Sequence, residues 1–292
     1  MFPRTGRDIL CLFIFISLLL SGCAGGKGDK VSSLSLKNPI DLLKESAQAM
    51  GEIKNYQVEM NINVNVTGEL KPFLSAKGIV QLEPQGMVME GTLNIEKQLT
   101  PLQIYLERNE DGSLTEYVKA PRGNDYWKAT LQSSPQLKHL NNPASILSLI
   151  TKNLTAAQVI GEQKKAHTSY ILIEATAGPE GFLGIYNQIN NPVLNNPQFL
   201  QTLKMANKLT YRLWLERDSL YVTRISVDLM DSFKEILHNL SPEAQERLGH
   251  MLLTLEFNLS NFNEDLQVVI PPDVKKQARD MPLPFNPILP EK

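Results

Sequence analysis

The sequence predicts an α+β fold in which a large antiparallel β-sheet dominates. Residues 56–67 alternate apolar and polar side chains without interruption, which is typical of a long strand with one covered face and one solvated face. Shorter apolar stretches follow at the spacing of a β-meander, and turn residues separate them. Helical patterns are few, and they occur before the first strand and between later ones.

The N-terminal half of the predicted domain begins with a helix. Asn38 is suited to cap that helix, Pro39 to occupy its first position and Gly51 to end it. The long strand over residues 56–67 comes next. Further strands of the meander are predicted at residues 74–82, 87–95, 102–106, 114–119 and 125–131.

The second half contains further antiparallel strands and is interrupted twice. A second helix is predicted from Asn142 and Pro143, and residues 170–173 are apolar on both faces, as in a central, covered strand. The interruptions at residues 178–208 and 231–249 are candidate lids over a cavity, or helices that plug the sheet. The first interruption includes a helix predicted at residues 198–207. Strands are expected at residues 157–163, 168–176, 209–215, 220–229 and 252–262.

The composition is that of a folded protein with a sizeable apolar core. Of the 292 residues, 42% are hydrophobic and 21% are charged, and 29 basic residues nearly balance 31 acidic ones. The sequence has no basic runs, which argues against nucleic-acid binding because that function needs clustered lysine and arginine. Two cysteines are too few for a disulfide scaffold or for a zinc site built from several thiolates.

The first 22 residues have the pattern of an export signal. Arg4 and Arg7 give a positive start, and the apolar residues 9–20 are too few to span the hydrocarbon core of a bilayer as a helix. The tetrapeptide Leu20-Ser21-Gly22-Cys23 then resembles the lipobox of bacterial lipoproteins. An ordinary secretory signal with a chance cysteine is the alternative.

The lipobox resemblance implies that residues 1–22 are removed and that Cys23 becomes a lipidated N-terminus. Such a cysteine carries a diacylglycerol, with acyl chains such as palmitate, and two chains give stable anchoring where one is marginal. The protein is then expected on the extracytoplasmic face of the cell membrane, or at the outer membrane of a Gram-negative host. Residues 23–37 would form a flexible tether, residues 38–280 the folded domain and residues 281–292 a proline-rich tail.

The order of the predicted elements resembles that of the LolA/LolB-like lipoprotein carriers and the related mycobacterial LppX/LprG lipoproteins. Residues 41–66 carry the resemblance as helix, glycine, short polar link and long strand, and residues 261–275 carry it as a last strand that leads into a proline-rich exit. The resemblance implies a strongly curved antiparallel sheet, a half-barrel, with helices packed on its concave face. It also implies an apolar cavity between sheet and helices that binds acyl chains.

Apolar side chains are therefore the candidate ligand contacts. Flexible, polarizable methionines suit a cavity that accepts chains of varying shape, and ordinary core filling is the alternative for each of them. The candidates for the lining of a lipid cavity are Val58, Met60, Ile62, Val64, Met87, Met89, Leu93 and Leu213.

Patterns for catalysis and metal binding are missing from the sequence. The four histidines stand singly, and there is no nucleophile elbow, phosphate-binding loop or dinucleotide fingerprint. We therefore expect no catalytic residue, no metal and no cofactor. Two functions remain open: a non-enzymatic, membrane-anchored carrier of a lipid or other amphiphile, or an envelope module with a self-filled half-barrel that contacts a partner protein or senses stress.

Overall fold

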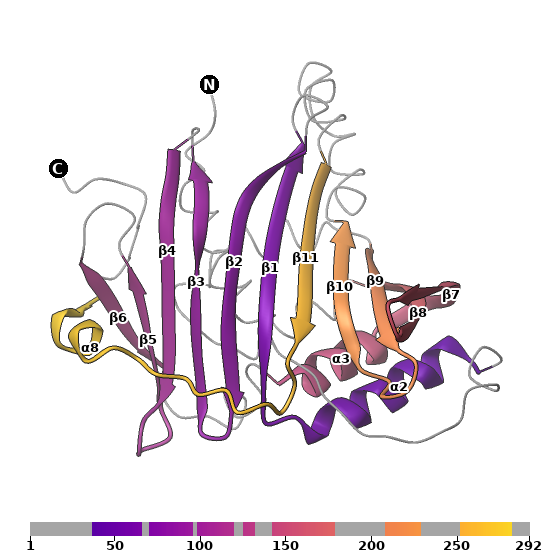
Figure 1. The fold of residues 1–292 in the computed structure, drawn as a ribbon, viewed down its shortest axis with the longest axis horizontal. Helices are drawn as coiled ribbons and strands as arrows, with labels where there is room; N and C mark the ends of the chain where they lie inside the picture. Colours follow the sequence, from indigo (N-terminus) through magenta and orange to yellow (C-terminus); the bar gives the residue numbers. More distant parts are fainter. Residues whose placement is uncertain are drawn as a thin grey trace.

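Twelve strands of the described chain form a single open sheet (Figure 1). Their spatial order is β12-β6-β5-β4-β3-β2-β1-β11-β10-β9-β8-β7, so β1 and β11 lie side by side although they are far apart in the sequence. The strand pairs are antiparallel, except that β12 pairs with β6 in parallel. The edges of the sheet are β7 and the two-residue strand β12.

The computed structural model describes residues 37–65, 70–95, 98–119, 125–131, 142–178, 208–228 and 252–281. The strands are β1 (Asn55–Asn65), β2 (Leu70–Leu82), β3 (Gln85–Ile95), β4 (Gln98–Arg108), β5 (Leu114–Lys119), β6 (Tyr126–Leu131), β7 (Leu154–Lys165), β8 (Thr168–Ala177), β9 (Leu209–Glu216), β10 (Val222–Asp228), β11 (Leu252–Ser260) and β12 (Arg279–Asp280). The helices are α2 (Pro39–Ala49), the 3-10 turn η2 (Met50–Glu52), α3 (Pro143–Lys152) and α8 (Pro272–Gln277).

Several expectations from the sequence concern residues outside these ranges. They are the signal over residues 1–22, Cys23, most of the tether, the two interruptions and the tail beyond residue 281.

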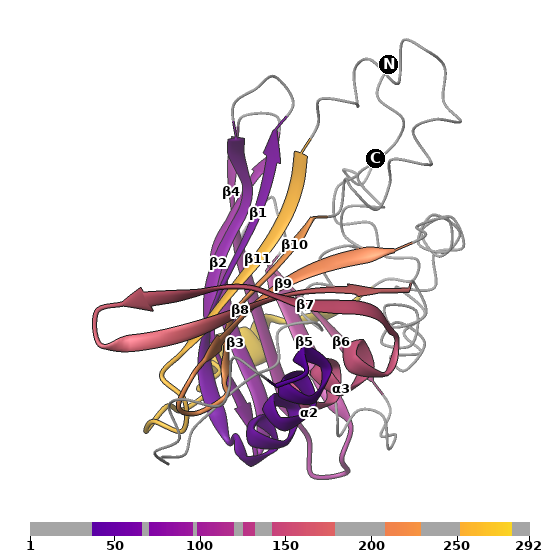
Figure 2. The ribbon, with the colours of Figure 1, turned by 90° about the vertical axis from the view of Figure 1, so that its right-hand side faces the viewer.

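The sheet is strongly twisted and curved. Figure 2 shows β7 and β8 running almost crosswise to β1 and β2, as right-handed strand twist accumulates across many strands. Helices α2 and α3 pack near strands β9 to β11, on the face that bears Val58, Met60 and Ile62 (Figures 1 and 2). We call this the inner face and the opposite one the outer face. The predicted α+β half-barrel with helices on one face is confirmed.

Helix α2 begins and ends near the positions that the sequence predicts. The Asn38 side chain accepts a hydrogen bond of 2.9 Å from the backbone N–H of Ile40, and Pro39 follows as the first helical residue. Leu42 and Leu43 are fully buried in the core. None of the described helices is long and apolar enough to cross a membrane.

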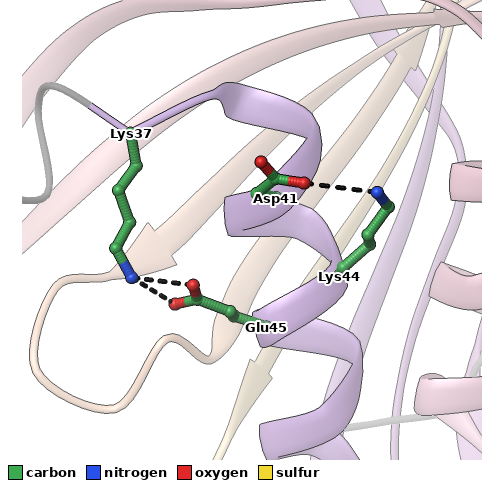
Figure 3. Close-up of polar contacts among 4 residues, drawn as sticks. All are labelled: Lys37, Asp41, Lys44 and Glu45. Atoms are coloured by element: carbon green, nitrogen blue, oxygen red, sulfur yellow. Dashed lines mark hydrogen bonds and ion pairs between the residues drawn. The ribbon is translucent and has the colours of Figure 1, made fainter.

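The solvent side of α2 carries two ion pairs, which Figure 3 shows. Lys37 lies 2.7 Å from Glu45, and Lys44 lies 3.2 Å from Asp41. Lys44 and Asp41 are well exposed, Lys37 and Glu45 are 39% exposed, and ion pairs at the surface contribute little to stability. Burial of the apolar side therefore holds α2 in place, while the pair formed by Lys37 attaches the start of the described chain to the helix.

Helix α3 has the same kind of N-terminus. The Asn142 side chain accepts a hydrogen bond of 3.3 Å from the backbone N–H of Ser145, and Pro143 is the first helical residue. Ile146, Leu147 and Ile150 are buried against the inner face and α2. The two helices thus form one apolar layer over one end of the sheet.

Two glycines allow close approach between strands β2 and β3. A Cβ atom added at Gly91 would overlap the carbonyl oxygen of Ser75 and lie 2.5 Å from the Cα of Ala76. One added at Gly78 would overlap the carbonyl oxygen of Val88. Glycine in a strand often marks such an approach, and here it permits the local curvature of the sheet.

Strands β2 and β4 extend further than the sequence predicts. Strand β2 includes Pro72, which lies next to the shift of register between Ile62 and Asn63 of β1, and such irregularities accommodate proline. Strand β4 includes Pro101, which pairs with Thr92.

Strand β8 differs from the expectation of a central strand covered on both faces. It lies next to the edge strand β7, and its burial alternates, with Ile171 and Ile173 buried and Leu172 half-buried. The apolar run at residues 170–173 therefore reflects one buried face, and its other face is only partly covered.

The C-terminal segment covers part of the outer face, which was not predicted from the sequence. After β11 the chain runs along the lower end of the sheet to α8 (Figure 1), and Ile270 and Val274 pack against Tyr105 and Tyr117. The backbone N–H of Val268 donates a hydrogen bond of 3.3 Å to the Gln81 side chain. Residues 104–106 of β4 and most of β5 are therefore buried on both faces.

The close approach at Gly91 gives a test of the fold. We expect Gly91→Ala to lower the free energy of unfolding by about 1–3 kcal/mol, because the backbone of β2 must move to admit the new methyl group. Gly161→Ala is the matched control, since no atom lies within 4 Å of a Cβ at Gly161 in β7, and it should be neutral or stabilise by less than about 1 kcal/mol. Urea unfolding of both variants measures the difference, and equal stabilities would contradict the close approach.

Candidate functional site

The structure brings the eight predicted cavity residues onto the inner face. Seven of them are at most 6% exposed, and Val64 is half-buried against the same core. They come from three strands: β1 carries Val58, Met60, Ile62 and Val64, β3 carries Met87, Met89 and Leu93, and β9 carries Leu213. Whether they contact a ligand remains a prediction, because the same positions also suit a packed core.

Cross-strand register links these residues into continuous apolar rows. Met60 in β1 pairs with Phe257 in β11, and Leu213 in β9 reaches the same row through Ile225 in β10. This row, from β7 to β4, comprises Val159, Ile173, Leu213, Ile225, Phe257, Met60, Ala76, Gly91 and Leu102. A neighbouring row comprises Leu259, Val58, Gly78, Met89, Ile104 and Val118. The inner face is therefore an apolar wall that crosses most of the sheet.

A hollow lies where this wall meets the helices. It is lined by apolar residues of η2, α3, β10 and β11, namely Met50, Pro143, Ile146, Leu147, Ile150, Val222, Ile225, Phe257 and Leu259. Its volume is about 330 Å³ when the solvent at its mouth is counted, but the space within it holds only about one water molecule. None of the eight residues predicted from the sequence lines this hollow.

One carboxyl group interrupts the apolar wall. Glu116 in β5 pairs with Leu106 of β4 and Ala129 of β6, and it lies in the row that also contains Met87. The side chain is 6% exposed. Burial in these apolar surroundings raises the pKa of the Glu116 carboxyl from an ordinary 4.5 to about 7. No other aspartate or glutamate among the described residues is buried to this degree.

Glu116 was not predicted from the sequence, although a signal for it was present. In β5, Leu114 and Val118 are two residues away on either side of Glu116, so all three share one face of the strand. A charged residue among the apolar positions of a strand has two explanations. Either the alternate residues have been assigned to the wrong face, or the acid is buried. Only the packing of Tyr117 against Ile270 on the other face decides between them.

Tyr211 is a second polar group within the inner wall. It lies in β9 and is 3% exposed, and burial raises the pKa of its phenol. It pairs across the sheet with Ala175 and Val227. Its hydroxyl therefore remains in the neutral form throughout the physiological range.

The outer face is polar along the same strands. Arg212 lies 3.2 Å from Glu174, and Arg224 lies 2.9 Å from Glu256. The Arg224 guanidinium also lies 4.5 Å from the ring centre of Trp214. The contrast between the two faces follows directly from the alternation in the strands.

In the part of the chain that the structure describes, no three His, Cys, Asp or Glu residues come together as metal ligands do. The chemical character of the site is thus an extended apolar surface in which a few polar groups are embedded, Glu116 and Tyr211 among them.

The raised pKa of Glu116 predicts a pH dependence of stability. The unfolded chain loses this proton near pH 4.5, whereas the folded protein keeps it to about pH 7. The free energy of unfolding therefore falls as the pH rises through this window, by about 3 kcal/mol from this group. Glu116→Gln should remove this contribution.

Urea unfolding of wild type and Glu116→Gln across this pH range measures the effect as a difference between the two proteins. Glu59→Gln, which replaces an exposed carboxyl of the outer face, is the control and should follow the wild type. Parallel curves for all three proteins would mean that Glu116 is not desolvated.

No protein-family model and no curated protein sequence matches the chain. Among solved structures, lipoprotein LppX of Mycobacterium tuberculosis aligns over 79% of this chain and 97% of its own, with 15% identity and a TM-score of 0.43. LprF from Mycobacterium bovis aligns over 80% and 96%, with 13% identity and a TM-score of 0.45. A LolA superfamily protein from Nitrosomonas europaea aligns over 83% and 98%, with 10% identity and a TM-score of 0.30.

Proposed function

We propose that this protein is a non-enzymatic, membrane-anchored lipoprotein that binds or carries a lipid or other amphiphile on its inner face. The observation that carries the proposal is the continuous apolar wall, which runs from β5 through β11 to β7, while the outer face of β8 to β11 carries ion pairs. A wall of this kind binds acyl chains by removing apolar area from water, without fixed hydrogen bonds.

The dimensions of the wall fit this role. From β5 to β11 there are five steps between strands, each of about 4.8 Å, so the wall extends roughly 24 Å across the strands. One acyl chain in a bilayer spans about half of the 30 Å hydrocarbon core, or roughly 15 Å. The width of the wall is therefore sufficient for an acyl chain laid across the strands.

The side chains of the wall also fit this role. Aliphatic residues predominate, and Met60, Met87 and Met89 lie near its centre, on strands β1 and β3. Methionine adapts its shape to different partners because its side chain is unbranched and polarizable. A binding surface with these residues accommodates chains that differ in length and unsaturation.

Anchoring through Cys23 complements this proposal. Fourteen residues, 24–37, separate Cys23 from the N-cap of α2, and they reach at most about 50 Å when extended. The pair between Lys37 and Glu45 attaches the end of this segment to α2. A lipidated Cys23 would therefore keep the inner face within reach of the membrane surface, on the extracytoplasmic side.

A second candidate function is favoured by the hollow beside α3. Because the hollow holds only about one water molecule, the half-barrel can equally be filled by its own side chains at this place. The protein would then be an envelope module that contacts a partner protein or senses stress. The two candidates differ in whether lipid is bound.

The first test of lipid binding is native mass spectrometry of untagged protein purified from its own host. We expect lipid to co-purify with the wild type. In Met89→Gln, which places an amide in the wall, we expect the lipid-bound fraction to fall severalfold. Glu90→Gln alters the next residue of β3, on the outer face, and should retain lipid. Repeated recovery of lipid-free wild type would exclude the carrier and favour the self-filled module.

The anchor has a separate test in the intact mass of the mature protein. We expect wild type to begin at Cys23 and to carry a diacylglycerol, and Cys23→Ala to retain residues 1–22 without added lipid. Cys11→Ala changes the other cysteine of the chain and should be processed as wild type. Normal processing and membrane attachment of Cys23→Ala would show that the lipobox interpretation is wrong.

A further inference from the structure

The buried carboxyl of Glu116 is the feature that neither the fold nor a purely apolar binding wall explains. On the inner face it is surrounded by Leu114 and Val118 of its own strand, Leu106 of β4 and Ala129 of β6. Acidic side chains are almost never buried to this extent unless they are paired, because an unpaired polar group loses its hydrogen bonds to water. Leucine at this position would continue the apolar row.

No donor within the described residues bonds to this carboxyl. The nearest cation on the inner face of β4 is Arg108, two pairs further along, and its guanidinium donates to the Gln85 side chain at 2.5 Å and to the Gly112 carbonyl at 2.9 Å. On the outer face, Lys128 of β6 pairs with Asp280.

The other charged groups near Glu116 are also on the outer face. Glu107 of β4 accepts a hydrogen bond from the Tyr117 hydroxyl at 2.9 Å and pairs with Lys275. From β6, Trp127 and Leu131 share the inner face with Ala129. The hydrogen-bonding capacity of Glu116 is therefore left for a group that does not belong to the described chain.

We propose that Glu116 binds the polar part of the amphiphile by a hydrogen bond to an ester or hydroxyl oxygen, which makes the preferred ligand an uncharged, oxygen-bearing lipid of the acylglycerol class. This inference rests on the proposed function. The apolar rows that lead from β5 toward β11 then receive the acyl chain. An anionic headgroup is disfavoured because it would meet a second negative charge whenever Glu116 ionises.

The same geometry makes ligand binding depend on pH. The neutral carboxyl both donates and accepts a hydrogen bond, whereas the carboxylate only accepts and is costly to bury. The pKa of Glu116, raised by burial to about 7, places this change within the physiological range. Binding of an ester-bearing lipid therefore weakens as the pH rises through neutrality.

The test uses monolaurin as the probe, because it carries one ester, two hydroxyls and a single acyl chain. The chain has two tryptophans. Trp127 lies two pairs away from Glu116 on the inner face, while Trp214 contacts Arg224 on the outer face. In a Trp214→Phe background, the fluorescence of Trp127 reports binding. Ligand titrations near pH 5.5 and near pH 8.5 measure binding on either side of the pKa of Glu116.

We expect the background protein to bind monolaurin several times more tightly at the lower pH. Glu116→Gln keeps a donor and an acceptor but cannot ionise, so it should bind equally at both pH values. Glu116→Leu keeps the apolar wall but loses the hydrogen bond, and its affinity at the lower pH should fall roughly tenfold. Glu59→Gln, on the outer face, should behave as the background protein.

A second probe separates this inference from the proposed function. Dodecyltrimethylammonium has a chain of the same length but no hydrogen-bonding group, so near pH 5.5 all four proteins should bind it alike. If all four bind monolaurin with one affinity and one pH profile, the role of Glu116 is overturned while lipid binding stands. If the background protein binds neither probe at either pH, the proposed function itself is overturned.

Discussion

The burial of one continuous apolar face is the constraint on which the rest of the structure depends. Because side chains alternate in every strand, commitment of Met60 and Ile62 to the inner face directs Glu59 and Asn61 to the outer face. The pairing of β1 with β11 carries the same separation into the second half of the sheet. Helices α2 and α3 have narrow apolar sides that cannot be buried alone, so their positions follow from that of the wall.

Local sequence patterns predict the elements well, and they predict least what depends on contacts across the sheet. Uninterrupted alternation identifies β1 within two residues, and the Asn-Pro pairs at Asn38 and Asn142 locate the starts of both longer helices. The pairing of β1 with β11 has no local signal. Helix α8 was missed because it is short, and its place is set by the contact of Val274 with Tyr117 on a distant strand.

In the candidate site, too, local sequence patterns predict some features and miss those that depend on contacts between distant segments. All eight predicted residues share the inner face because each lies in the apolar phase of its strand. The hollow was missed because its lining combines η2, α3, β10 and β11, and no periodicity in the sequence joins these four segments. Glu116 was missed because its strand is covered on both faces, so composition alone does not distinguish the inner side from the outer one. The C-terminal segment packs on the outer side of β5 and so identifies the side of Glu116 as the inner one.

The pairing of β1 with β11 also has a consequence for biogenesis. The first long strand to be synthesised finds its partner on that side only when the last long strand has been made. Until then the meander from β1 to β6 has an unpaired, partly apolar border that is open to association with other chains. Contacts between such distant segments slow folding. The nascent chain therefore depends on being shielded until its synthesis is nearly complete, and a truncation before residue 252 removes the strand that joins β1 to β10.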